Sequence, residues 1–158
     1  SKIAVRIRLL KPLLHNNYMK DKRRYQFYKL YKGLMMSFDL SEAAFMVYMA
    51  DLDALRNLGH KTIRPLSVHL NYLGFGRRTF NRCVNKTIRM GLLERVAIDG
   101  MYDYFIDMQA YNRLVSIVSS TNSYVALRSF CKKVFDDDKR SIQSVSEEEI
   151  CKLRNAQW

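Results

Sequence analysis

The amino-acid sequence predicts a mainly helical α+β fold with a small antiparallel sheet. Capping residues and glycines bracket several segments whose apolar residues recur at helical spacing, above all residues 37–59. The dipeptide Asp99-Gly100 separates two short runs that alternate in the manner of strands, which is typical of a β-hairpin. Hydrophobic residues make up 48% of the 158 residues, which is enough to bury a core.

The amino-terminal 35 residues predict two elements separated by a loop. Residues 2–10 alternate between apolar and mostly basic side chains, so they predict a strand with one basic face. Residues 20–24, with the sequence KDKRR, predict a solvated loop. Residues 25–35 are rich in aromatic side chains and fit either a second strand or a short helix.

The clearest helix candidate lies within residues 37–59. Asp39 or Ser41 can cap its start, and Glu42 stands three residues after Asp39, as a capping box requires. Gly59 is a natural stop. The residues expected to face the core are Phe45, Tyr48, Met49, Leu52 and Leu55.

Two further helices are expected over residues 64–74 and 77–90. The first has Pro65 in its first turn and ends at Gly74. On a helical wheel, the second helix divides into two faces. One face carries Phe80, Cys83, Val84, Thr87 and Ile88. The other carries cations and amides without a carboxylate, namely Arg78, Asn81, Arg82, Asn85, Lys86 and Arg89.

Three more helices are expected after the predicted hairpin. Asp107 can cap a helix through residues 108–118, and the next helix covers residues 123–135. A polar break, DDDKR, follows at residues 136–140. Ser146 and Glu149 have the spacing of a capping box and predict a short last helix.

Composition restricts the classes of function. The chain has 27 basic and 15 acidic residues, a net charge of +12, which points to nucleic acid as the first choice of partner. The three cysteines and three histidines are scattered, so we expect no disulfide framework, no metal site and a reducing compartment. The sequence contains no apolar run of membrane-spanning length and no secretory signal pattern, so a cytoplasmic protein without a membrane partner is expected.

No catalytic motif is recognisable in the sequence. There is no Gly-x-Ser-x-Gly, no phosphate-binding loop and no metal-spaced His/Glu set. We therefore expect a protein that is not an enzyme and uses no cofactor or small-molecule ligand.

The cationic face of residues 77–90 indicates a polyanionic partner. Arg78/Arg82 and Arg82/Lys86 are like-charge pairs at i,i+4 spacing, which destabilise a helix mildly, whereas an ordinary solvated face mixes charges. Arginine and asparagine also have the geometry to contact base edges. The base-edge candidates are Arg78, Asn81, Arg82 and Asn85. The phosphate candidates are Arg77, Lys86, Arg89, Arg64 and Arg95.

The order of these elements is that of a helix-turn-helix followed by a wing. Residues 74–96, GFGRRTFNRCVNKTIRMGLLERV, resemble the winged-helix pattern, in which a small-residue turn and Arg-Arg-Thr open the recognition helix and Gly-Leu-Leu leads into the wing. The matching residues are Gly74, Phe75, Arg77, Arg78, Thr79, Val84, Ile88, Gly91, Leu92 and Leu93. Residues 27–52 resemble the lead-in of the winged helices of phage and plasmid replication initiators and replisome organisers.

The resemblance implies a double-stranded-DNA-binding protein whose helix 77–90 enters the major groove. It would regulate transcription or bind a replication origin, for example on a mobile element, and associate with the nucleoid. Three parts are expected: a basic arm or strand over residues 1–24, a winged-helix domain over 25–108, and a helical extension over 109–158. Winged-helix proteins often dimerise through such extensions, so we expect a homodimer, with other replication or transcription proteins as further partners.

Two residues depart from the winged-helix pattern, and two alternative functions stay open. Gly76 stands where Ser, Thr or Asp usually caps, and the predicted wing tip carries Asp99 and no cation. The acidic tip favours a protein-interaction module of a replication or conjugation assembly that does not read DNA. The basic amino-terminal segment also fits RNA binding.

Overall fold

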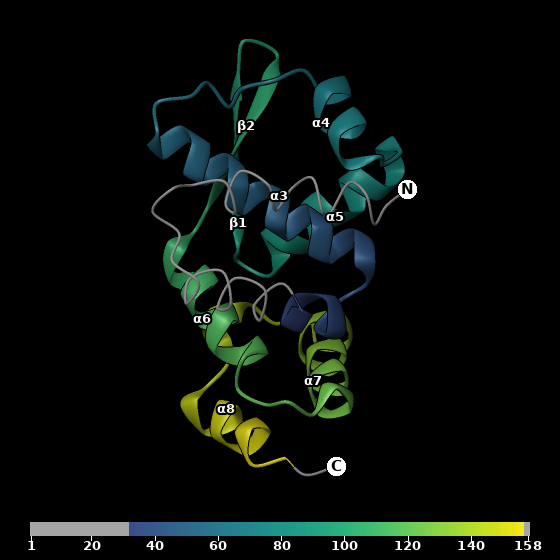
Figure 1. Cartoon of the computed structure of the whole chain (residues 1–158), viewed down its shortest axis with the longest axis vertical. Coiled ribbons are helices and arrows are strands. Elements are labelled where there is room, and N and C mark those ends of the chain that lie inside the picture. The colour runs from purple at the N-terminus through teal and green to yellow at the C-terminus, as the bar shows by residue number, and fades with distance from the viewer. Residues whose placement is uncertain (1–31, 157–158) are drawn as a thin grey trace.

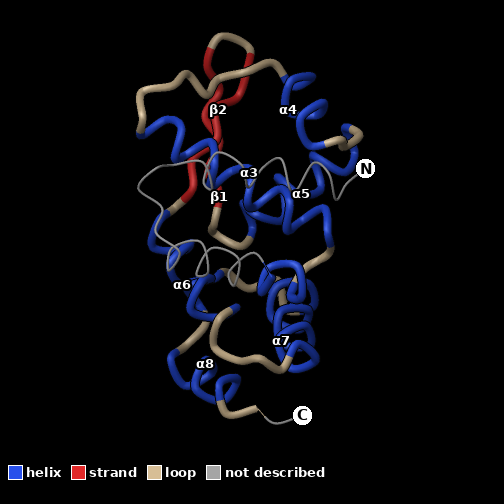
Figure 2. Tube along the Cα trace, viewed as in Figure 1, coloured by secondary structure: helices blue, strands red, loops and turns tan. Residues whose placement is uncertain are grey.

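The computed structural model describes residues 32–156. Helices dominate this part of the chain, and its one sheet has two antiparallel strands, which confirms the predicted mainly helical α+β class (Figure 1). The β-hairpin and α4 lie toward one end of the long axis, α7 and α8 lie toward the other, and α3 crosses between them (Figure 2). The predicted basic strand over residues 2–10 and the loop over 20–24 lie outside the described residues.

Helix α3, Leu40–Asn57, begins as its capping signals predict. The Asp39 carboxylate accepts from the Glu42 backbone N–H at 2.8 Å, and Glu42 Oε1 accepts from the Asp39 backbone N–H at 3.2 Å. The helix ends two residues before Gly59, whose φ is +88°. Residues 32–37 are also helical, so the strand alternative for the end of segment 25–35 is wrong.

Helices α4, Leu66–Leu73, and α5, Arg77–Arg89, follow the predicted ranges closely. Pro65 directly precedes α4, where its missing N–H costs no helical hydrogen bond. Gly74 ends α4 in the left-handed region at φ 70°, a conformation that glycine adopts without a steric penalty. The tight turn between the two helices therefore has a local cause in the sequence.

Strands β1, Leu93–Ile98, and β2, Met101–Ile106, form the predicted hairpin. Leu93 lies opposite Ile106 at its base, and Ile98 lies opposite Met101 at its tip. Asp99 and Gly100 have φ angles of 51° and 77°, the positive values that a type I′ turn requires at both central positions.

The remaining elements are helical, and two of them, α6 and α8, start at predicted caps. They are α6 (Met108–Val118), α7 (Tyr124–Cys131), the π-helical turn η1 (Lys132–Asp137), the 3₁₀ turn η2 (Ile142–Ser144) and α8 (Glu147–Arg154). Asp107 caps α6 and the Ser146/Glu149 capping box starts α8, as expected. The single helix predicted over 123–135 is instead an α-helix that widens into a π-helical turn after Cys131.

The core is built on α3, which is buried from Ser41 to Met49. The Phe45 ring meets the edge of the Phe80 ring of α5 with 5.5 Å between centroids, and Phe80 in turn meets Tyr104 of β2 at 5.9 Å. Leu55 is half-buried, whereas the other four residues predicted for the core face of this helix are buried. These contacts fix α5 and the hairpin against the same helix.

The apolar stripes of the carboxy-terminal helices are mostly used within the chain. Leu114, Val118 and Val134 are at most 3% exposed, whereas Val125 is 74% exposed. These buried stripes leave less apolar surface for a second copy than the sequence suggested. The homodimer stays a prediction.

Candidate nucleic-acid interface

The outer face of α5 forms one wall of a cleft of about 1170 Å³. Helix α7 and η1 contribute to the lining, and the turn before α3 also borders the cleft. Seven basic residues line it: Arg77, Arg78, Arg82, Lys86, Arg89, Arg128 and Lys132. Three acidic residues line it as well, namely Asp39, Glu42 and Asp136. The cationic face of α5 therefore meets carboxylates that belong to other elements.

Lys86 lies in the fold and not at the surface predicted for a phosphate contact. Its side chain is 8% exposed, and its Nζ lies 2.9 Å from Glu42 Oε2 and 2.5 Å from Asp136 Oδ1. Nζ also lies 5.3 Å from the centroid of the Phe38 ring. A wheel of α5 alone places Lys86 with the exposed cations, because the wheel does not include the α3 and η1 residues that cover it.

Arg82 is also paired, although it stays half-exposed. Its Nη1 lies 3.1 Å from Asp39 Oδ2 and 3.0 Å from Glu42 Oε2. Burial alone would lower the pKa of Arg82, but the neighbouring Asp39 and Glu42 carboxylates raise it above its ordinary value. Arg82 is therefore not a free cation in this structure, and its contact with base edges stays a prediction.

Glu42 connects the capping of α3 with the charge of α5. Its Oε1 accepts from the Asp39 backbone N–H, while its Oε2 pairs with both Arg82 and Lys86. The like-charge repulsion between Arg82 and Lys86 is therefore relieved within the fold. The like-charge spacing of Arg82 and Lys86 therefore no longer indicates a polyanionic partner for these two residues.

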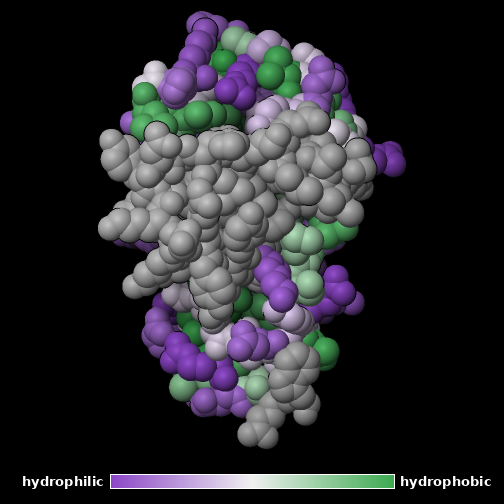
Figure 3. All heavy atoms as spheres, in the orientation of Figure 1, coloured by the Kyte–Doolittle hydropathy of each residue, from purple (hydrophilic) through white to green (hydrophobic). Residues whose placement is uncertain are grey.

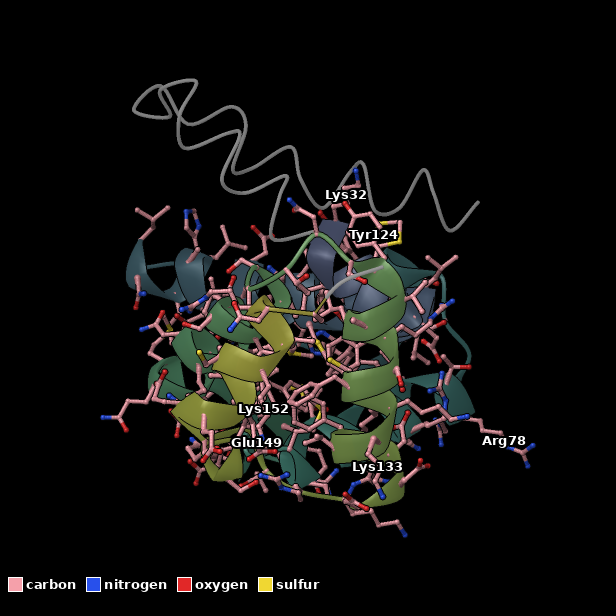
Figure 4. All side chains as sticks on the ribbon, turned by 90° about the horizontal axis from the view of Figure 1, so that it is seen from below. Lys32, Arg78, Tyr124, Lys133, Glu149 and Lys152 are labelled. Carbon is pink, nitrogen blue, oxygen red and sulfur yellow. The ribbon has the colours of Figure 1, made fainter. Side chains whose placement is uncertain are left out.

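Four polar residues on the outer face of α5 are free. Arg77, Arg78, Asn81 and Asn85 are exposed and make no ion pair or side-chain hydrogen bond with the described residues. Arg78 extends away from the body of the molecule (Figure 4). Near the other end of the helix, Arg89 donates to the Phe135 carbonyl at 3.2 Å, which ties it to η1. The free polar face of α5 thus consists of Arg77, Arg78, Asn81 and Asn85.

Two cations of the cleft were not singled out from the sequence. Arg128 and Lys132 are exposed, line the cleft from α7 and the start of η1, and make no ion pair within the described ranges. They stand four residues apart, the same like-charge spacing that drew attention to α5. This spacing is visible in the sequence, but the packing of α7 beside α5 is not.

Arg64 and Arg95 lie away from this cleft, beside the hairpin, where they line a smaller pocket. Arg64 is half-buried, and Arg95 is exposed with its guanidinium 4.5 Å from the centroid of the Tyr102 ring. Asn81 of α5 lines both the cleft and the smaller pocket. The predicted site residues are therefore divided between two neighbouring surfaces.

Two buried cysteines have strongly raised pKa values. Burial raises the pKa of the Cys83 thiol and of the Cys131 thiol to about 12 in each case, so neither is a ready nucleophile. Between residues 32 and 156, no group of three His, Cys, Asp or Glu side chains could hold a metal ion. No helix in this same range is both long and apolar enough to cross a membrane.

Comparisons with protein-family models, with curated protein sequences and with solved structures give no match to this chain.

Proposed function

We propose that this protein binds double-stranded DNA with the amino-terminal half of α5 in the major groove. The observation that carries the proposal is the free polar face of Arg77, Arg78, Asn81 and Asn85, which has no carboxylate bound to it within the described residues. Arginine and asparagine are suited to guanine and adenine edges in that groove. Regulation of transcription and binding at a replication origin are the roles that such a reader would serve.

The order of elements supports the same proposal. Helices α3, α4 and α5 followed by the β1–β2 hairpin match the order of a winged helix-turn-helix, in which the third helix reads DNA. Arg128 and Lys132 face the same cleft and would contact phosphates beside the groove. The paired residues Arg82 and Lys86 would then hold the reading helix in position without contacting bases.

A protein-interaction module is the second candidate, and the hairpin favours it. Val96, Ile98 and Tyr102 are 40%, 37% and 43% exposed, while the tip carries Asp99 and no cation. Hydrophobic residues lie among hydrophilic ones at this end of the face drawn in Figure 3. A wing of this composition suits contact with protein better than entry into a minor groove.

The test is fluorescence anisotropy with a mixed-sequence duplex and with single strands of the same DNA and RNA sequence, at low and moderate salt. We expect the wild-type protein to prefer the duplex and its affinity to fall steeply with salt, because each phosphate contact releases counterions. A preference for single-stranded RNA would favour the RNA alternative. Absence of binding to any of the three at low salt would favour the protein-interaction module.

A further inference from the structure

A pocket of about 230 Å³ lies between α4, α5 and the hairpin, on the other side of Asn81 from the large cleft. The polar and aromatic residues that line it are Arg64, His69, Asn81, Arg95, Tyr102 and Tyr104. No acidic side chain lines it, whereas three line the large cleft. The pocket thus presents hydrogen-bond donors and positive charge without an internal counter-ion.

His69 supplies a buried donor to this pocket. The residue is 1% exposed, its Nδ1 lies 2.5 Å from the Tyr48 hydroxyl, and its Nε2 has no hydrogen-bond partner among the described residues. Burial lowers the pKa of His69 to about 4, so the imidazole is neutral at pH 7 and carries one proton. The position of that proton decides whether Nε2 donates.

Tyr48 places the proton on Nε2. Arg64 lies near the Tyr48 hydroxyl and lowers its pKa against the larger effect of burial, and a guanidinium can only donate hydrogen bonds. The buried hydroxyl satisfies its own O–H by donating to His69 Nδ1, which makes Nδ1 the acceptor. His69 lines the pocket, and its Nε2–H is then a buried donor without a partner among the described residues, which a bound acceptor would satisfy.

The two arginines are held at the pocket by their neighbours. The guanidinium of Arg95 lies over the Tyr102 ring, 4.5 Å from its centroid, and Arg64 is half-buried beside Tyr48. Neither arginine makes an ion pair with the part of the chain that the structure describes. The charge of Arg95 is therefore available to an anion that enters from outside, while the charge of Arg64 also acts on the buried Asp51 carboxyl.

We propose that this pocket binds a single phosphate group, held by the guanidinium groups of Arg64 and Arg95 and by the His69 Nε2–H. Arginine donors match the oxygens of a phosphate, which accept several hydrogen bonds at once. The volume is below the roughly 300–1,000 Å³ of pockets that enclose a whole small molecule, so it suits one chemical group.

The phosphate can come from the DNA backbone or from a free phosphate ester. A backbone phosphodiester is the source we assign, and this assignment rests on the proposed function. With α5 in the major groove, the hairpin beside it would flank a strand of the duplex, and Asn81 borders both surfaces. The pocket would then fix the register of α5 on the duplex without reading sequence.

The test follows the His69 side-chain nitrogens by NMR in the full chain, with a mixed-sequence duplex and with inorganic phosphate as separate probes. Arg95→Gln is the test variant because Arg95 is exposed, and Arg154→Gln on α8 is its matched control. We expect the duplex to shift the Nε2 resonance of the wild type and of Arg154→Gln. Arg95→Gln should lose this shift and reduce the salt slope of duplex binding by about 1.

The other outcomes separate the site from the proposed function. If inorganic phosphate shifts Nε2 in an Arg95-dependent manner but the duplex does not, the pocket is a phosphate site and the DNA backbone is not its source. If the duplex binds and neither probe moves Nε2, the pocket proposal is overturned while DNA binding stands. If the duplex does not bind and phosphate moves nothing, both proposals fail.

Discussion

Lys86 has an ammonium group that the fold uses internally. Its Nζ joins Glu42 of α3 to Asp136 of η1, and the Lys86 and Glu42 side chains are each 8% exposed. Removing one member of a buried ion pair leaves the other charge without compensation, which costs more than the pair itself contributes. A binding defect caused by mutation of Lys86 would therefore reflect folding before it reflects DNA contact.

We predict that Lys86→Met lowers the free energy of unfolding by about 2–4 kcal/mol, since Arg82 still pairs with part of the Glu42 charge. Urea denaturation followed by circular dichroism measures this change. Arg78→Met is the control, and at an exposed and unpaired position it should stay within about 0.5 kcal/mol of wild type. Equal stability of the two variants would contradict the role assigned to Lys86.

Asp51 and His69 give the fold two opposed responses to pH. Burial raises the pKa of Asp51 to about 6, while Arg64 lowers it to a smaller extent. A carboxyl group whose pKa is raised by folding stabilises the folded state fully when the pH is below its pKa in the unfolded chain, which is near 4. This stabilisation is lost as the pH rises through the folded-state pKa of about 6. The lowered pKa of His69 has the reverse effect, because its contribution is present above 6.5 and is lost as the pH falls through about 4.

We therefore predict that Asp51→Asn raises the free energy of unfolding at pH 7.5 by about 1–3 kcal/mol. Between pH 4 and 6 the variant should gain stability with pH, because the opposed contribution of Asp51 is removed and that of His69 remains. Thermal unfolding across this range tests both statements. A variant that is less stable than wild type at pH 7.5 would show that the Asp51 carboxylate is better compensated than its burial suggests.

At the scale of elements, α7 extends the cationic surface of α5. Lys132 and Lys133 are adjacent at the start of η1, but only Lys132 lines the large cleft. Lys133 instead lines a second groove, together with Glu149 and Lys152 of α8 (Figure 4). Its Nζ lies 3.0 Å from Asp138 Oδ1. The two lysines are thus a natural test and control.

We predict that Lys132→Ala reduces the salt slope of duplex binding by about 1, which corresponds to one lost phosphate contact. Lys133→Ala should leave the slope unchanged, because its side chain faces away from the cleft. Titrations at several salt concentrations give both slopes. Equal losses in the two variants would mean that general charge, and not the cleft, attracts the DNA.

Local signals in the sequence predicted the elements of the fold. The Asp39/Glu42 capping box, the left-handed Gly74 and the Asp99-Gly100 turn each act within a few residues, and each lies where it was expected. The π-helical turn after Cys131 was not predicted, because one wide turn leaves no distinct pattern in a helical segment.

The ion pairs of the candidate site could not be predicted from the sequence in the same way. Glu42 and Asp136 stand about 40 and 50 residues from the cations they neutralise, and only the packing of α3 and η1 against α5 brings them together. The sequence therefore predicted the polar face of α5 but not which of its cations are free. It also contained the i,i+4 pair Arg128/Lys132, whose place in the cleft depends on tertiary structure.

At the scale of the whole molecule, we propose that one end of α5 is the DNA-binding surface. The face formed by Arg77 and Arg78 is exposed, is free of ion pairs within the described residues, and lines the same cleft as Arg128 of α7 and Lys132 of η1. Helix α8 carries a comparable exposed pair, Lys152 and Arg154, far along the chain from the cleft. The two pairs have the same charge and differ in location, and Lys152 also lies 3.7 Å from the Glu148 carboxylate.

The most direct test is therefore the affinity for a mixed-sequence duplex, measured by fluorescence anisotropy for Arg77→Glu/Arg78→Glu and for Lys152→Glu/Arg154→Glu. Both double variants change the net charge by the same amount. We predict that the α5 variant loses duplex binding while keeping wild-type stability, and that the α8 variant binds nearly as well as wild type. Equal binding by the two variants would contradict the assignment of DNA binding to α5.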